Sequence, residues 1–343
     1  MVFDSFEFLR QEKRLNDISV LHVGNPAGVA SIISSEQEKI GMKSDVIVFN
    51  KKIYDFKSDE VINTWGNLGG SPKIVNDSLE LVKKAIEIQK RISDYDVIHF
   101  HYRSVFSVPC PLLPHGMDLP IWSIQNKTVV MHFHGSDIRW KDISWFYREF
   151  SDAILVATPD LLHWAPDTAT WVPTPIDTSL FDPYYPDSDN SKPIKIVHAP
   201  TNRETKGTQH VINAVSILKS RGYDIELQIV EDKPHSEAID IYKTADIAVG
   251  WVNPDFGIYG MFSKEAMALG KPVVASLTQS VKKHLPNSNP IIESDPEDLI
   301  DELEYLINHR DQLKDYGKQS REYVENTHDI SSVIQDYNRT YLV

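Results

Sequence analysis

IKIVHAPTNRETKGTQHVINAVSILKSR, residues 194–221, contains a complete strand, turn and helix. Its first six residues are mostly apolar and β-branched, which predicts a strand buried on both faces. A polar turn follows, and from Gly207 onward the apolar residues recur at the spacing of a helix. A buried strand followed at once by a helix is typical of a parallel sheet with helical cover.

The same unit recurs toward both ends of the chain. Apolar runs predict strands at 18–23, 45–49, 96–101, 128–134, 153–157, 169–172, 225–230, 247–251 and 272–275. Helical spacing predicts helices at 29–40, 77–93, 235–244, 262–269, 296–307, 309–325 and 329–341. We therefore expect the α/β class, with two doubly wound, Rossmann-like domains built on parallel sheets.

A break in this alternation indicates where the first domain ends. Residues 173–193 contain five prolines and no periodicity. A chain of 343 residues also exceeds a typical single core and suits two domains. We expect an N-terminal domain over 1–175, a linker over 176–193 and a second domain over 194–325.

Composition narrows the class of protein. The chain has 35 basic and 49 acidic residues, a net charge of −14, which argues against a general nucleic-acid binder. It has no apolar run of about 18 residues, and its first residues lack a secretory pattern. The single cysteine, Cys110, cannot form an internal disulfide or a cysteine metal cluster. These features predict a cytoplasmic protein without a membrane span or a nucleic-acid partner.

In doubly wound sheets ligands bind at the carboxyl ends of the strands, so the turns there carry the candidate site. The turn before Gly207 holds Arg203 and Lys206 just where a helix begins. A helix N-terminus and two cations favour an anion such as a phosphate or pyrophosphate. The glycine-rich run of a Walker loop is absent. A solvated turn with incidental charges explains the same residues equally well.

A second turn, at 257–265, carries two glycines whose backbone amides can approach a ligand. Ser263 is placed to cap the helix that follows. Glu265 then falls in the first turn of that helix, where its carboxylate can accept hydrogen bonds from two hydroxyls, as a ribose offers. A purely capping role for Glu265 is the alternative.

The histidines form two alternating pairs, His99-Phe-His101 and His132-Phe-His134. We expect His99 and His132 to be packed inside their strands, and His101 and His134, which end the strands, to be functional. The alternation superficially suggests a metal site. Alternation in a buried strand produces the same pattern, so we predict no metal.

An aromatic and basic segment, 139–148, has two interpretations. It could face a membrane surface or an acceptor. We favour the alternative, an amphipathic helix with its aromatic side chains packed inward.

Together these segments resemble the retaining GT-B glycosyltransferases of family four. The run EAMALGKPVV, 265–274, matches the signature of that family, and it follows a glycine loop as the signature does. Arg203 and Lys206 resemble its Arg…Lys-Gly element, and His134-Gly-Ser-Asp137 resembles its His-Gly-x-Asp element. Pro175-Ile-Asp-Thr-Ser-Leu-Phe181 resembles the segment before its second domain. The matches cover most of the chain in the expected order.

The resemblance implies a role for each matched residue. Glu265 would bind the nucleotide ribose, Lys206 and Arg203 would neutralise the leaving diphosphate, and His134 would lie in the cleft beside the donor sugar. The catalytic residues it implies are His134, Lys206 and Arg203. The donor-binding residues it implies are Glu265, Gly260, Met261, Phe262, Ser263, Gly257 and Gly28. On the acceptor side it implies His101, Asp137 and Arg139.

The resemblance also implies an architecture and an activity. Two Rossmann-like domains would face each other across a cleft in the GT-B arrangement, and a last helix, 326–343, would cross back to the first domain. The enzyme would transfer a hexosyl or related sugar from a UDP- or GDP-type sugar to a glycan, lipid-linked or small-molecule acceptor, with retention of configuration. The nucleotide sugar would be a co-substrate, with no further cofactor. Peripheral association at the inner face of a membrane is compatible with it.

The chain departs from the pattern of the family at two points. Gly257 stands where many members have a glutamate that contacts the sugar, although some members share the Gly-x-Tyr-Gly version of the loop. Arg203 lies three residues before Lys206, where five is usual. A nucleotide-sugar epimerase of the same architecture and a non-catalytic nucleotide-sugar-binding protein are the alternative functions.

Overall fold

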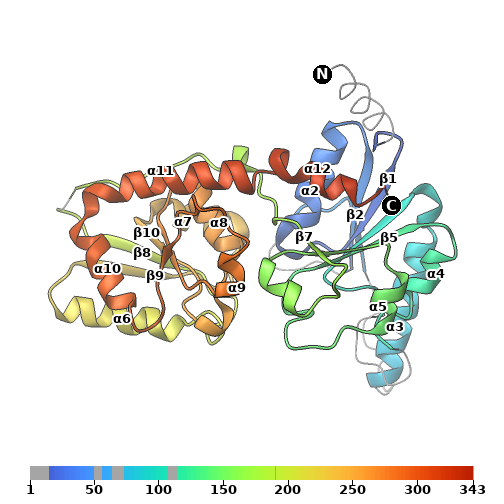
Figure 1. Ribbon diagram of the computed structural model, residues 1–343, viewed down its shortest axis with the longest axis horizontal. Helices are drawn as coiled ribbons and strands as arrows, with labels where there is room; N and C mark the ends of the chain where they lie inside the picture. The colour runs from blue at the N-terminus through green and yellow to red at the C-terminus, as the bar shows by residue number, and fades with distance from the viewer. Residues whose placement is uncertain (1–14, 50–55, 64–72, 107–113, 190, 343) are drawn as a thin grey trace. The chain divides into compact units, whose positions relative to one another are not determined.

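The computed structural model describes residues 15–49, 56–63, 73–106, 114–189 and 191–342 (Figure 1). The chain forms two compact units. The first unit runs to Pro175 and also takes in the C-terminal residues from Val333 onward. The second unit comprises Ile176–Ser332.

The first unit is built on a seven-stranded parallel sheet with strand order β3-β2-β1-β4-β5-β6-β7. Its strands are β1 (Ser19–Val23), β2 (Lys43–Phe49), β3 (Glu60–Ile62), β4 (Val97–His101), β5 (Thr128–Phe133), β6 (Ala153–Val156) and β7 (Thr170–Trp171). Its helices are α2 (Val29–Lys39), α3 (Lys73–Gln89), α4 (Leu119–Ser123) and α5 (Trp145–Phe150). Every residue of β4 is buried, as expected of a central strand covered on both faces.

The second unit has a five-stranded parallel sheet with strand order β12-β11-β10-β8-β9. Its strands are β8 (Ile194–His198), β9 (Ile225–Ile229), β10 (Ile247–Val249), β11 (Val273–Ala275) and β12 (Ile292–Glu293). Its helices are α6 (Thr208–Ser220), α7 (His235–Thr244), α8 (Met261–Ala268), α9 (Gln279–Lys282), α10 (Leu299–Asn308) and α11 (Arg310–Thr327).

Alternate residues of these strands enter two separate cores, one on each face of the second sheet. Val197 and Ala248 pack with residues of α7, α8 and the end of α11, whereas Ile196 and Val249 pack with α6 and α10. A sheet with helices on both faces is the doubly wound arrangement. The predicted fold class is therefore confirmed for both units.

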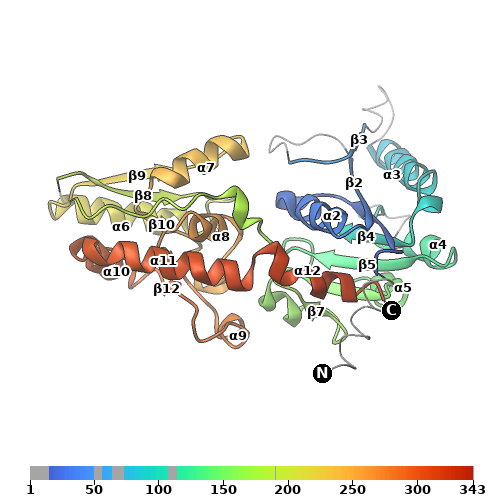
Figure 2. The same ribbon diagram turned by 90° about the horizontal axis from the view of Figure 1, so that it is seen from above.

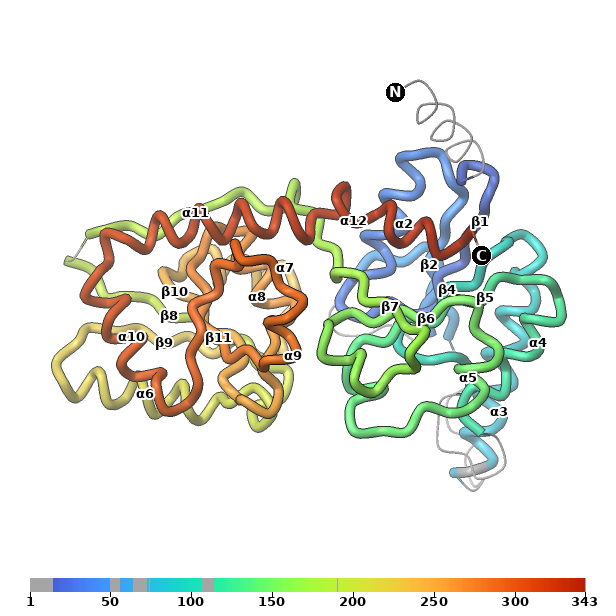
Figure 3. The backbone as a smooth tube through the Cα atoms, in the orientation of Figure 1, coloured from blue at the N-terminus to red at the C-terminus, as the bar shows by residue number. Residues whose placement is uncertain are grey.

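The chain returns to the first unit through its last helix, α12 (Ile330–Arg339), which follows α11 directly (Figures 2 and 3). Tyr337 is wholly buried, and its hydroxyl donates to the Pro173 carbonyl over 3.3 Å. Gln37 of α2 donates from Nε2 to Asn338 Oδ1 over 2.9 Å. The end of α12 is thus part of the first core.

Four short elements escaped the sequence prediction: β3, β12, α4 and α9. Each has two to five residues, too few for a periodicity to develop. The helix expected over 77–93 begins earlier, at Lys73. The usual sign of a helix start, an Asp or Ser before the first apolar residue, fails here because Asp77 and Ser78 lie inside the helix.

The aromatic segment 139–148, which includes the start of α5, also differs from its favoured interpretation. Tyr147 is buried, but Trp140 and Trp145 are each 58% exposed. The prediction that the aromatic side chains pack inward is therefore wrong for the two tryptophans. Trp140 precedes the helix, and a helix of six residues has too little surface to bury all of its own aromatic side chains. Cys110 lies outside the described residues. None of the helices described is both long and apolar enough to span a membrane.

Candidate functional site

Lys206 lies at the carboxyl end of β8 with its side chain only 7% exposed. Its Nζ donates to the Ala199 carbonyl over 3.0 Å and lies 5.4 Å from the centre of the Trp251 ring. Burial lowers the pKa of Lys206 to about 8, against the opposing charge of Glu265. A cation held in this way keeps part of its hydrogen-bonding capacity for an anionic ligand.

The loop that carries Lys206 is locked to the loop after β10. Val252 donates its backbone N–H to the Lys206 carbonyl over 3.2 Å. Gly207 adopts a φ of +69°, and a Cβ there would lie 1.9 Å from the Val252 carbonyl oxygen. Only glycine combines this backbone with so close an approach. The position of Lys206 therefore depends on the residue that follows it.

Glu265 lies in α8 and is also buried, with 7% exposure. Its Oε1 lies 2.7 Å from Nε2 of His235, the first residue of α7. The carboxylate raises the pKa of His235, so the pair is a charge-assisted hydrogen bond when the imidazole is protonated. His235 is a candidate site residue that the sequence did not reveal, because no local pattern links α7 to α8.

The start of α8 provides backbone donors close to Lys206. Gly260 is the N-cap residue, and no side chain caps the helix. The first amides of a helix have no partner inside it, so those of Met261 and Phe262 are available to an anion. A Cβ on Gly260 would lie 3.1 Å from Nε1 of Trp251, which is also the ring below Lys206. Trp251 therefore contacts both the lysine and the helix start.

Two expectations about α8 need correction. Ser263 does not cap the helix, which already begins at Met261, and its side chain is wholly buried against Gly250. Glu265 therefore lies in the second turn rather than the first. The sequence misplaced the start because Gly260 satisfies the backbone geometry of an N-cap without offering a side-chain signal.

Gly257 has no room for a side chain. A Cβ there would lie 2.5 Å from the backbone nitrogen of Thr278, which donates to the Gly257 carbonyl over 2.9 Å. The loop is packed against the chain after β11 at this point. A glutamate at position 257 is therefore incompatible with the observed path of the backbone.

Arg203 differs from Lys206 in its surroundings. Its side chain is 58% exposed, and Nη2 lies 2.5 Å from Oε2 of Glu231 after β9. Exposed ion pairs of this kind contribute little to stability. The structure brings Lys206, Glu265 and the start of α8 together, whereas Arg203 is engaged with Glu231.

In the first unit, the loop after β5 is held by internal bonds. The Asp137 carboxylate accepts from the amides of His134, over 2.8 Å, and Gly135, over 2.6 Å. Burial raises the pKa of Asp137 to about 6. Arg139 is buried and donates from Nε to Asp160 over 2.7 Å. Both residues fix the loop around His134, and their expected contact with an acceptor stays a prediction.

The other predicted residues of the first unit lie at the ends of β1 and β4. Gly28 precedes α2 with a φ of +77°, and a Cβ there would lie 2.8 Å from the Phe56 ring. His101, expected to be functional, is buried with 3% exposure. It lies among His22, His99 and His132, which are wholly buried.

The comparisons with known proteins agree with this fold. Residues 209–339 match a protein-family model described as glycosyl transferase-like. The search of curated proteins gave no match. Solved structures, among them a glycosyltransferase and a starch synthase, match nearly the whole chain at low identity.

Three of these structures illustrate the likeness. A glycosyltransferase from Rickettsia africae matches 95% of this chain and 98% of its own, with a TM-score of 0.66 and 15% identity. HepE from Anabaena, in complex with UDP-glucose, matches 94% and 99%, with a TM-score of 0.65 and 12% identity. The catalytic domain of starch synthase IV from Arabidopsis thaliana, bound to ADP and acarbose, matches 95% and 99%, with a TM-score of 0.64 and 10% identity. The chain has the fold of these two-domain, GT-B-type enzymes.

Proposed function

We propose that this protein is a retaining glycosyltransferase that transfers a hexosyl or related sugar from a nucleotide-diphosphate sugar. The observation that carries the proposal is the group formed by Lys206, the uncapped start of α8 and Glu265. It lies at the carboxyl ends of parallel strands, where α/β sheets bind nucleotides. The glycosyl transferase-like family model covers the part of the chain that contains α8 and Glu265.

Each part of this group suits one part of a nucleotide diphosphate. The ammonium of Lys206 and the first amides of α8 would stabilise the charge that develops on the departing diphosphate. The Glu265 carboxylate would accept hydrogen bonds from the ribose hydroxyls. This division of roles needs no metal ion and no side-chain nucleophile, in keeping with a front-face displacement. His134 stays predicted to lie beside the transferred sugar, and Gly28 to contact a phosphate.

The nucleotides bound in similar structures support a choice of donor. HepE is bound to UDP-glucose and starch synthase IV to ADP, and the resemblance of the sequence adds GDP. We propose a nucleotide hexose of the UDP, ADP or GDP type as the donor. A glycan or lipid-linked molecule is the proposed acceptor. Exposed Trp140 and Trp145 of the first unit are suited to contact either an acceptor or a membrane surface.

A donor panel tests the proposal. The full-length protein is incubated with UDP-, ADP- and GDP-hexoses and a mixed acceptor panel, and the products are identified by mass spectrometry and NMR. A sugar joined to an acceptor with retained configuration supports the proposal. A rearranged free sugar would show an epimerase instead, and tight binding without any turnover would show a binding protein.

A further inference from the structure

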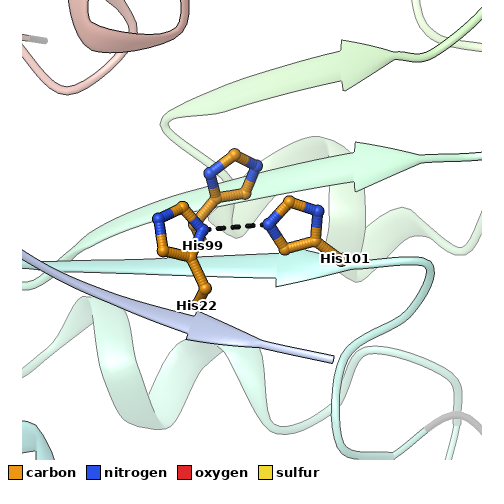
Figure 4. Close-up of side chains that lie close together, drawn as sticks. All are labelled: His22, His99 and His101. Atoms are coloured by element: carbon orange, nitrogen blue, oxygen red, sulfur yellow. Dashed lines mark hydrogen bonds between the residues drawn. The ribbon is translucent and has the colours of Figure 1, made fainter. Parts of the chain in front are cut away.

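Five histidines from three neighbouring strands gather inside the first unit: His22 of β1, His99 and His101 of β4, and His132 and His134 of β5 and the loop after it. The strand register pairs His22 with His99 and His101 with His132. All except His134 are buried. Figure 4 shows the rings of His22, His99 and His101 side by side.

Three of these rings form a continuous chain of hydrogen bonds that begins at Gln37. Gln37 Oε1 lies 3.0 Å from His22 Nε2, and His22 Nδ1 lies 3.0 Å from His101 Nε2 (Figure 4). The second ring nitrogen of His101, Nδ1, lies 3.3 Å from His134 Nε2. The chain thus connects α2 to the residue predicted to lie beside the sugar, at the carboxyl end of β5.

The direction of the hydrogen bonds is set at Gln37. The Ser44 hydroxyl donates to Gln37 Oε1 over 2.7 Å, while Gln37 Nε2 donates to Asn338. The amide oxygen therefore faces His22, so His22 Nε2 must carry the proton. A neutral imidazole has one N–H. His22 and His101 must therefore each donate a hydrogen bond from Nε2 and accept one at Nδ1 from the next ring of the chain. Carried along the chain, this leaves His134 protonated at Nε2 and unprotonated at Nδ1.

The surroundings keep the inner rings neutral. Burial is the main cause that lowers the pKa of His22 to about 4 and the pKa of His101 well below its usual value. The neighbouring His99 engages Tyr341 instead, its Nδ1 lying 2.8 Å from the hydroxyl. His132 has no hydrogen-bond partner at either ring nitrogen among the described residues. Neither ring interrupts the chain.

A metal ion shared by His99 and His101 fits this arrangement poorly. The rings of His99 and His101 stack with their centres 4.2 Å apart and their planes only 20° apart. The lone pair of an imidazole nitrogen lies in the ring plane, so two nearly parallel stacked rings cannot direct lone pairs at one ion. The contacts between His22, His101 and His134 are accounted for as hydrogen bonds.

We propose that Gln37, His22 and His101 are positioning residues, which hold His134 as the Nε2–H tautomer with Nδ1 as a hydrogen-bond acceptor. The further step rests on the proposed function: this Nδ1 accepts a hydrogen bond from a hydroxyl of the transferred sugar. A tautomer fixed from behind favours one direction of hydrogen bond to substrate. Because the tautomer is already set in the free protein, binding of the substrate does not have to shift the tautomer equilibrium.

Long-range ¹H–¹⁵N NMR of the imidazoles in the full-length protein tests the tautomers without any assay of transfer. We expect His22, His101 and His134 to give the pattern of neutral Nε2–H rings. The Nδ1–H pattern, or a protonated ring, at any of the three at pH 7 overturns the proposal. One equivalent of bound metal in the purified protein would overturn it as well.

Paired variants test the link to His134. His101→Phe removes the middle of the chain, and we expect a mixture of His134 tautomers and a fall in kcat of about tenfold with little change in donor KM. His132→Phe is the matched control, because this ring makes no link in the chain, and should leave both readouts unchanged. Equal effects of the two variants would overturn the positioning role. If His101→Phe fails to fold, Gln37→Met removes the acceptor at the start of the chain, and an unchanged His134 tautomer in Gln37→Met overturns the assignment.

Discussion

At the scale of the residue, the candidate site depends on a buried ammonium group. Lys206 is packed between the Ala199 carbonyl and the Trp251 ring, and its pKa is lowered to about 8. The charged form is the one that stabilises a leaving diphosphate. At pH 7 most of the free protein has a protonated Lys206, and this fraction falls as the pH rises through its pKa.

The pH dependence of the reaction follows from the loss of the Lys206 charge at high pH. We predict that kcat/KM for the donor, which reports the free enzyme, falls above about pH 8, where Lys206 loses its proton. The measurement is a pH profile of initial rates. Lys206→Arg provides the control, because a guanidinium stays charged and should remove the alkaline limb from whatever activity is left. A wild-type profile flat to pH 10 would contradict the assignment.

His235 gives a second prediction at this scale. Since it bonds to Glu265, His235→Ala should weaken nucleotide binding by about fivefold through loss of a partly exposed charge-assisted bond of about 1 kcal/mol. Glu265→Ala should have a larger effect, because it removes the group that we assign to the ribose. Titration calorimetry with UDP, ADP and GDP measures both. The account fails if His235→Ala matters more than Glu265→Ala.

Gly257 gives a third prediction at the scale of the residue. Gly257→Glu introduces the side chain that many members of the resembled family have, but its Cβ would meet the backbone of Thr278. We predict that this variant raises the donor KM at least about tenfold, because the loop before α8 must move. Steady-state kinetics with a saturable donor measures the effect. An improved kcat/KM would show that the packing account of this position is wrong.

At the scale of the element, the site is a pair of loops held together by backbone contacts. The loop before α6 carries Lys206, and the loop after β10 carries Trp251 and Val252. Gly207 permits their close approach, with its φ of +69° and the neighbouring Val252 carbonyl. A small change in this contact moves the lysine.

We therefore predict that Gly207→Ala lowers the free energy of unfolding by about 2 kcal/mol and reduces turnover by more than that loss of stability explains. Gly222→Ala is a matched control, because Gly222 has a φ of +97° but nothing within 4 Å of the added Cβ. Gly222→Ala should lower the free energy of unfolding only through its strained backbone, by about 1 kcal/mol, and leave turnover intact. Denaturant unfolding and rate measurements compare the two, and equal losses of turnover would contradict the loop contact.

Long elements could be predicted from sequence, and their contacts could not. The apolar run of β8 and the periodicity of α6 are local, so both elements lie within two residues of their predicted bounds. The pair of His235 and Glu265 depends on the packing of α7 on α8, to which no local pattern refers. The histidine chain depends on the register of β1, β4 and β5, and the alternation His99-Phe-His101 gave no sign of it.

At the scale of the whole molecule, the chain leaves the first unit and returns to it through α12. Tyr337 and Asn338 are wholly buried in the first unit, and Gln37, the anchor of the histidine chain, bonds to Asn338. The end of the chain therefore contributes to the core that surrounds the histidines.

We predict that Tyr337→Ala lowers the free energy of unfolding by about 3–5 kcal/mol, as for other large buried aromatic residues. Asp336→Ala, at an exposed position of the same helix, should change it by less than about 0.5 kcal/mol. Chemical denaturation followed by fluorescence measures both. A Tyr337→Ala variant as stable as Asp336→Ala would mean that α12 does not belong to the first core.

The most direct test of the central claim is the rate at which nucleoside diphosphate is released from the preferred donor by the wild type and by Lys206→Met. The account predicts measurable release with at least one of the UDP-, ADP- and GDP-hexoses. It also predicts a fall of about 100-fold in Lys206→Met, comparable with the loss of an oxyanion donor. The same rate in both proteins would contradict the claim that Lys206 stabilises the leaving diphosphate.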